Sequence, residues 1–324
     1  MSLGPGLVHA SILDGKGGCR DAKAADIAGW SPEQGCLWIH LDRGSEDARE
    51  WLRHDSGLEA NAADAMLAIE TRPRSISFRN GLLVILRGVN LNAGADPEDM
   101  VALRMWVEKD RVITVRARRL MAVQAMRDSL DEGRGPADAG GLLAGIANGL
   151  VDRMGPVIDE MGDVVDGLED ELLVSESRDI RMRLREMRRE AIGLRRHLAP
   201  QRDALARLQQ EDQPWLDASH RMRLRETADR VLRIVEELDE LRERAAIIQD
   251  ELMNRLSEQM NRTMYVLTVV ASILLPLSFV TGLLGINVGG IPLAENSLGF
   301  IIVVAILVVV GALQIYIFRR LKWM

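Results

Sequence analysis

The sequence has few of the residues that build covalently linked or metal-bound cores. Only two cysteines occur in 324 residues, Cys19 and Cys36, and they do not have CxxC spacing. Neither a disulfide framework nor a thiolate zinc site is therefore indicated. The five histidines show no paired spacing, and ordinary surface or core positions are the simplest interpretation of His9, His40, His54, His197 and His220.

Features of enzymes, nucleic-acid-binding proteins and secreted proteins are also missing. A net charge of −7 argues against nucleic acid as a partner. No Gly-rich phosphate loop follows a predicted strand, and no Ser/His/Asp grouping is evident. The first 15 residues lack a basic region followed by an apolar core, so no signal peptide is predicted. We expect no catalytic residues and no resident cofactor.

Charged side chains are absent from two long stretches, residues 263–294 and residues 296–318. Apolar runs lie inside them at 265–284 and at about 298–318. Each run is about 20 residues, long enough to cross a hydrocarbon layer of about 30 Å as a helix. A buried helix pair of a soluble protein is the alternative, but two uncharged runs in succession are more typical of a membrane hairpin.

Basic residues flank this hairpin and predict its orientation. Arg255 and Arg262 precede the first run, whereas the connector 285–297 carries only Glu295 as a charge. The positive-inside rule places both chain ends in the cytoplasm and the connector outside. The basic residues after the second run are Arg319, Arg320 and Lys322.

Residues 1–140 are predicted to form an α/β domain. Short apolar runs predict a strand at 36–43 and hairpins around Asn80-Gly81 and Lys109-Asp110. Alternation of polar and apolar positions indicates a sheet with one covered face. Helices are expected at 48–54, 59–69 and 119–132.

Residues from 142 onward are almost wholly helical in pattern. Pro200 and Pro214 are the expected breaks, and the long segments are 142–175, 178–211 and 216–284. The first segment is acidic and the second is Arg-rich, which favours an antiparallel pair of helices. The charges are compatible with solvated helix faces, and also with an acidic face that is presented to cations.

The third segment spans about 100 Å if it is one helix with a rise of 1.5 Å per residue. A helix of that length must pack against neighbours or other copies, so we expect an oligomer with a bundled stalk. Its apolar seam consists of Leu224, Ala228, Val231, Val235, Leu238, Leu241, Ala245 and Ile248.

A second stripe follows one face of the same helix into the membrane, with alternating spacing of three and four. It carries amide and hydroxyl groups, which in a span face a bundle interior or a water-filled path; its apolar members would be dry constrictions. The alternative is that the hydroxyls bond back to the helix and pack against the second span. The stripe is Asp250, Asn254, Ser257, Asn261, Met264, Thr268, Ala271, Leu275 and Ser278.

The end of the first span has two further features. Pro276 removes a backbone donor and leaves the carbonyl of Ser272 without its usual partner. Gly285 can leave helical geometry, and Asn287 can offer an amide oxygen at the outer mouth. A ring of such oxygens suits a divalent ion or its bound water.

At these residues the chain resembles the CorA-type divalent-metal transporters, whose signature here reads Gly285-Ile286-Asn287. It departs from the Gly-Met-Asn of the magnesium-transporting members and lacks their Met-Pro-Glu-Leu loop. The continuation GLLGINVGGIP, residues 282–292, is similar to the ZntB zinc-transporter branch. Signature, span count, stalk helix and basic tail together cover the whole chain.

The resemblance implies a homopentameric funnel in a bacterial inner membrane, with five pore helices around its axis. It implies that Asn287 forms the outer selectivity ring, touching metal through water, with Ser278 and Leu275 below it. The implied organisation is an α/β domain at 1–140, a cytoplasmic stalk at 141–264, a pore-lining span at 265–284, an external loop at 285–297, a second span at 298–318 and a cytoplasmic tail at 319–324.

The resemblance also implies proton-driven zinc uptake, although zinc prefers Cys, His and carboxylate ligands. No ionisable carboxylate, His or Lys lies within either span, so an intramembrane proton relay is not indicated. Glu295 either attracts cations to the mouth or is a solvated loop charge. The alternatives are a channel-like magnesium, cobalt or nickel transporter and a membrane-anchored helical scaffold that conducts nothing.

Overall fold

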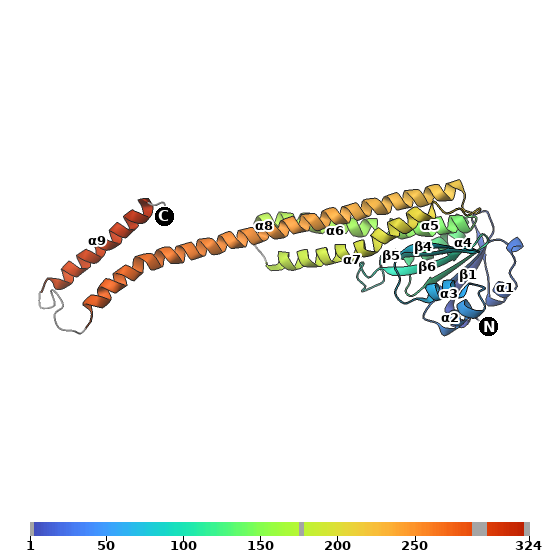
Figure 1. Ribbon diagram of the computed structural model, residues 1–324, viewed down its shortest axis with the longest axis horizontal. Helices are drawn as coiled ribbons and strands as arrows, with labels where there is room; N and C mark the ends of the chain where they lie inside the picture. Colours follow the sequence, from blue (N-terminus) through green and yellow to red (C-terminus); the bar gives the residue numbers. More distant parts are fainter. Residues whose placement is uncertain (1–2, 175–177, 287–296, 321–324) are drawn as a thin grey trace. The chain divides into compact units, whose positions relative to one another are not determined.

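The structure is a computed structural model that describes residues 3–174, 178–286 and 297–320 (Figure 1). Contacts divide the chain into two compact units, residues 1–249 and residues 250–324. The helix α8 (Ala218–Leu284) contributes to both units.

The first unit contains a seven-stranded sheet in the order β2-β1-β3-β7-β6-β5-β4. Neighbouring strands are antiparallel except β3 and β7, which are parallel. The mixed sheet and its covering helices confirm the predicted α/β class. The strands are β1 (Leu7–Leu13), β2 (Cys19–Asp21), β3 (Leu37–Asp42), β4 (Arg74–Phe78), β5 (Gly81–Gly88), β6 (Val101–Val107) and β7 (Arg111–Arg116).

Helices cover both faces of this sheet, so the expectation of a single covered face was wrong (Figure 1). Helices α2 (Glu46–His54) and α3 (Ala60–Leu67) enclose one apolar core with the strands. Helices α4 (Met121–Asp131), α5 (Ala139–Asp152) and α7 (Arg178–Leu208) lie on the other side. Every residue of β6 is therefore buried, and burial on both faces removes the alternation a half-exposed strand would show. The remaining short helices are η1 (Gly4–Gly6), α1 (Ala24–Ala28) and η2 (Pro32–Gln34).

The two predicted hairpins differ in their turns. Val107 pairs with Val112, and Glu108 N–H donates to the Arg111 carbonyl, which leaves Lys109-Asp110 as the loop, as predicted. In the other hairpin Phe78 pairs with Gly81, so Arg79 and Asn80 form the loop and the predicted turn was one residue late.

Gly81 is required for close approach rather than for turning. A Cβ at Gly81 would lie 2.8 Å from the Val107 carbonyl and 2.9 Å from the Trp106 ring. The glycine therefore lets β5 pack against β6 at its first residue.

Of the two prolines expected to break the helical part, Pro214 lies between α7 and α8, whereas Pro200 is not a break. The segment 142–175 is two helices, α5 and α6 (Gly155–Val174), with Pro156 in the first turn of α6, where its missing N–H is not needed. Pro200 does not break α7 but lies inside it. Hydrogen bonds after the proline hold α7 to the sheet: Gln201 Oε1 accepts from Arg87 N–H at 2.6 Å, and the Ala204 carbonyl accepts from Ser75 Oγ at 3.2 Å.

Helix α8 begins at Ala218, after Pro214, with Asp217 accepting a hydrogen bond from the His220 N–H at 2.9 Å. Its apolar seam, from Leu224 to Ile248, is buried within one copy of the chain. The chain's own helices therefore cover the seam, and the seam itself is no evidence for an oligomer. Charged contacts accompany it, including Arg244 to Glu169 on α6 at 2.8 Å and Arg195 on α7 to Asp239 at 2.7 Å.

The second unit contains the rest of α8, from residue 250, and α9 (Gly299–Arg320). Both helices contain a window long and apolar enough to cross a membrane. In the α8 window 6% of residues are buried, and in the α9 window none are. A core helix pair of a soluble protein would be mostly buried, so this alternative does not fit.

Candidate ion pathway

The backbone carbonyl that Pro276 leaves without its helical donor is bonded to α9. Helix α8 continues through Pro276, which cannot donate to the carbonyl of Ser272. In the structure Gln314 Nε2 on α9 lies 3.4 Å from that carbonyl oxygen and donates to it. The acceptor that the sequence leaves without a partner is thereby satisfied by the second span.

One face of α8 is turned toward α9. Val269 is 8% exposed, and Ser272, which accepts the bond from Gln314, is partly buried. The other shielded positions recur three or four residues apart, which is the period of one helix face. They are Ile273, Leu277, Val280 and Leu284.

The stripe predicted to line a pore lies on a different face. At 100° per residue it is centred on the order of 140° around the helix axis from the face turned toward α9. Every residue of the stripe is exposed, and Leu275 is 68% exposed. The hydroxyls at Thr268 and Ser278 are therefore not packed against the second span within one chain.

Threonine hydroxyls of α8 bond to their own helix. Thr268 Oγ1 donates to the Met264 carbonyl at 2.8 Å, and Thr281 Oγ1 donates to the Leu277 carbonyl at 3.1 Å. Such back-bonding uses the hydroxyl proton and leaves the oxygen lone pairs directed outward. The Thr268 oxygen can then act as an acceptor on the exposed face, which suits a cation or its water shell.

The signature segment is described only in part. Helix α8 ends at Leu284, and the Gly285 N–H donates to the Thr281 carbonyl at 2.9 Å. Ile286 is 47% exposed. Asn287 and Glu295, predicted as the selectivity ring and the external charge, lie outside the described residues.

At the lower end of the stripe, Asp250, Asn254, Ser257, Asn261 and Met264 are also exposed on α8. They share one face by their spacing, so the structure brings them into line along the helix. Within one chain this face of α8 is not covered, so its side chains contact either solvent or other copies of the chain.

Two histidines that sequence spacing did not connect lie together in the sheet. His9 on β1 is the register partner of His40 on β3, and their ring centroids are 5.0 Å apart. Burial, then Arg127, lowers the pKa of His9 to about 4, and burial holds the pKa of His40 well below its usual value. Strand order, which sequence spacing does not contain, creates this pair.

This histidine pair is a poor cation site. Arg127 and Arg116 act on it with positive charge. Among residues 3–174, 178–286 and 297–320, no group of three or more His, Cys, Asp or Glu side chains is arranged to hold a metal ion.

The class of the protein follows from the two exposed apolar helices and from the polar stripe on the face of α8 that is turned away from α9. An α/β body carries a two-helix membrane anchor with an oxygen-bearing helix face, as in ion transporters. The family model described as CorA-like Mg2+ transporter protein matches residues 33–320. The chain belongs to this family of membrane transporters, which move divalent metal ions.

Relatives match the chain along nearly its whole length. The divalent cation transporter CmaX of Pseudomonas aeruginosa is 42% identical, over 98% of this chain and 97% of the relative. The zinc transport protein ZntB of Pectobacterium carotovorum is 35% identical, over 98% of this chain and 96% of the relative. The solved structure of full-length CmaX superposes with a TM-score of 0.86 at 40% identity, covering 98% of both chains.

Proposed function

We propose that this chain transports zinc as a homopentamer in a bacterial inner membrane, with α8 of each copy lining a central pore. The observation that supports this most is the exposed polar stripe on α8. It points away from α9, and its amide, hydroxyl and carboxylate side chains would be expensive to place in lipid. Five copies arranged with this face inward would enclose the stripe and leave α9 toward the acyl chains.

Along such a pore the rings would have distinct roles. Asn287 is the proposed outer selectivity ring, followed inward by oxygen rings at Ser278 and Thr268. Leu275 and Met264 are the proposed dry constrictions that gate the path. Asn261, Ser257, Asn254 and Asp250 continue the oxygen surface toward the cytoplasm, where both termini lie in this proposal.

Zinc is the proposed ion because ZntB proteins are among the relatives and the loop after the signature is similar to theirs. The rings offer amide and hydroxyl oxygens rather than the thiolates and imidazoles that bind zinc tightly. A zinc ion that keeps most of its water shell suits such a surface, since tight binding would slow exit from the pore.

The second candidate is a broader divalent-cation channel that passes magnesium, cobalt or nickel down the membrane potential. It is favoured by the CmaX relative, which is named only as a divalent cation transporter. Oxygen rings are the ligands that magnesium prefers. Proton coupling belongs to the zinc proposal, and its protonatable groups would be Glu295 outside and Asp250 inside.

The test is ion uptake into proteoliposomes that contain the purified chain, with and without an inward proton gradient. We expect zinc uptake that increases with the gradient, and native mass spectrometry that finds five chains of 36.0 kDa. Magnesium uptake without zinc uptake would replace the first candidate with the second. Absence of uptake for every divalent ion would contradict both.

Asn287→Ala is the matched variant for the selectivity ring, and Gln259→Ala is its control, since Gln259 carries the same amide on another face of α8. We expect Asn287→Ala to change the rate or selectivity of uptake and Gln259→Ala to leave both unchanged. Equal uptake by the two variants would remove Asn287 from the pathway.

A further inference from the structure

Arginines from four neighbouring strands gather at one edge of the sheet. Strands β3 and β7 are parallel and end at the same edge, where β5 also ends and β6 begins. Arg43 follows β3 and Arg118 follows β7, while Arg87 is the penultimate residue of β5. Arg104 of β6 pairs with Ile85 of β5 and Val115 of β7. It therefore lies slightly further into the sheet than the other three arginines.

These arginines line a cavity of about 300 Å³, together with His197 of α7. A second cavity of about 530 Å³ adjoins it and is lined by Arg49 and Arg53. The residues that line both cavities are Arg43, Ile69 and Ala117. The carboxyl ends of parallel strands are where α/β sheets most often bind ligands, and the whole site lies within residues 1–249.

The guanidinium groups in this cavity have no carboxylate partner. Arg104 is 1% exposed, and its Nη2 donates to the Ala68 carbonyl at 2.7 Å, while its Nε and Nη1 are buried without an acceptor. Arg43 donates to the same carbonyl at 2.9 Å. Arg87 donates to the Met100 and Thr71 carbonyls, and its Nε also lacks an acceptor. No ion pair involves these three arginines in the part of the chain that the structure describes.

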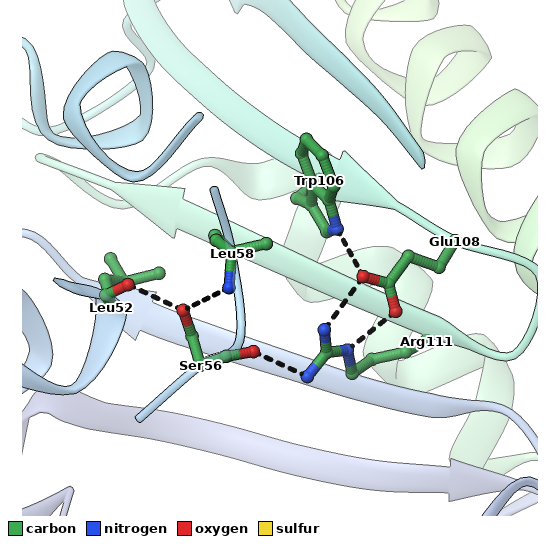
Figure 2. Close-up of polar contacts among 6 residues, drawn as sticks. All are labelled: Leu52, Ser56, Leu58, Trp106, Glu108 and Arg111. Atoms are coloured by element: carbon green, nitrogen blue, oxygen red, sulfur yellow. Dashed lines mark hydrogen bonds and ion pairs between the residues drawn. The ribbon is translucent and has the colours of Figure 1, made fainter. Parts of the chain in front are cut away.

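Two other shielded arginines in the same unit are paired with carboxylates. Arg111, at the opposite end of β7, forms a two-pronged pair with Glu108 at 2.8 and 3.0 Å and donates to the Ser56 carbonyl (Figure 2). Arg127 contacts the carboxylates of Asp21 and Asp131. This fold therefore provides carboxylate partners for some of its shielded arginines, but not for those that line the cavity.

The acidic residues that line the cavity do not supply that counter-charge. Glu98 pairs with Arg189 at 3.5 Å, and Asp99 is exposed at the wall. Four arginines thus face two carboxylates, one of which is already paired. Burial, then Arg43 and Arg87, lowers the pKa of Arg104 to about 10, so at neutral pH Arg104 keeps its charge in an unfavourable setting.

We propose that this cavity binds a small soluble anion that carries linked phosphate groups, of the diphosphate class. Planar guanidinium forks match phosphate oxygens in pairs, and three adjacent forks require more than one negative charge. Arg43, Arg87 and Arg118 are not fully buried, and their guanidinium groups are the ones that such oxygens would engage. The buried, unpaired charge of Arg104 beneath them adds to the attraction for an anion. A cavity of about 300 Å³ has room for a diphosphate, and the adjoining cavity has room for a substituent. The proposal does not depend on which ion the membrane unit transports.

The test is calorimetric titration of the full-length purified chain with sodium pyrophosphate, at fixed ionic strength and without divalent metal. Arg43→Gln and Arg118→Gln each remove one lining charge, and Arg79→Gln is the control, an exposed arginine in the β4–β5 loop. We expect each lining variant to weaken pyrophosphate binding by at least about tenfold, the effect of losing a hydrogen bond to a charged group. The control is expected to bind like the wild type.

Arg104→Met gives an independent measurement. Since an unpaired buried charge destabilises a fold, the methionine variant is expected to unfold at a higher temperature without ligand and to lose the stabilisation by pyrophosphate. The proposal fails if wild-type protein does not bind pyrophosphate, or if equimolar chloride competes equally. It also fails if a structure of the assembly shows a carboxylate of a neighbouring copy filling the cavity.

Discussion

The two parts of α8 carry similar spacing patterns with opposite outcomes. In residues 218–249 the apolar seam is buried by helices of the same chain, and Leu238 is 0% exposed. In residues 250–284 the polar stripe and most apolar side chains are exposed, and Leu275 is 68% exposed. Spacing of three and four identifies a helix face in both parts, but only the structure shows which face is already covered.

The two parts of α8 also differ in their charged residues. The first part of α8 exchanges ion pairs with α5, α6 and α7, such as Arg230 with Asp152. The second part has no charged residue from 263 to its end. The first part is therefore stabilised within one chain, whereas the second needs lipid and, in our proposal, other copies.

The largest expected effect tests the covered part. Leu238→Ala removes a fully buried side chain from the seam and is expected to lower the free energy of unfolding by about 2–5 kcal/mol. Met222→Ala, at a 59% exposed position of α8, is the control and should change it by less than about 0.5 kcal/mol. Chemical unfolding of the full chain in detergent measures both, and equal effects would mean that the seam is not packed as described.

The next effect tests the uncovered part. Ser278→Leu puts an apolar side chain on the stripe and is expected to reduce divalent-ion uptake at least about tenfold, because a dry ring resists a hydrated ion. Val280→Leu is the control, which adds one methylene group to a side chain that is already apolar, on the face turned toward α9. If proteoliposome uptake falls more for Val280→Leu than for Ser278→Leu, the assignment of the two faces is reversed.

A smaller effect is expected at the contact between the spans. Gln314→Leu leaves the Ser272 carbonyl without its donor and should lower thermal stability in detergent by about 1 kcal/mol. Gln314→Asn has a shorter amide side chain that does not reach as far, so its thermal stability should lie between that of the wild type and that of Gln314→Leu. An unchanged melting temperature for the leucine variant would mean that this bond does not stabilise the contact between α8 and α9.

The smallest effect concerns the ion pairs of the first part. Arg244 contacts Asp166 at 2.5 Å and Glu169 at 2.8 Å, with 30% of its side chain exposed. Arg244→Gln is expected to lower the free energy of unfolding by about 0.5–1 kcal/mol, and less at high salt, because solvent screens such pairs. An effect as large as that of Leu238→Ala would contradict this ranking.

Much of the fold could be predicted where local signals and tertiary packing agree. The strand at β3, the start of α2 after Ser45 and the loop at Lys109-Asp110 follow from local residue chemistry. Predictions were wrong where packing overrides local preference. Pro200 remains inside α7 because neighbouring residues bond to the sheet, and Gly81 serves a close contact rather than a turn.

The candidate sites show the same limit. The stripe on α8 could be predicted because one helix carries all of it. The His9–His40 pair and the arginine cavity depend on which strands are neighbours, and spacing along the chain does not contain this. One signal was present: Arg43, Arg87 and Arg118 each lie at the end of an apolar strand run, but without the strand order they could not be grouped.

The two outermost strands of the sheet have a consequence for assembly. On one side β2 is only three residues long, and on the other β4 has five residues, follows Pro73 and carries an exposed Arg74. Short edges with proline and arginine give an incoming strand little backbone to pair with. These edges disfavour the joining of copies into continuous β-ribbons and favour association through helix and loop surfaces.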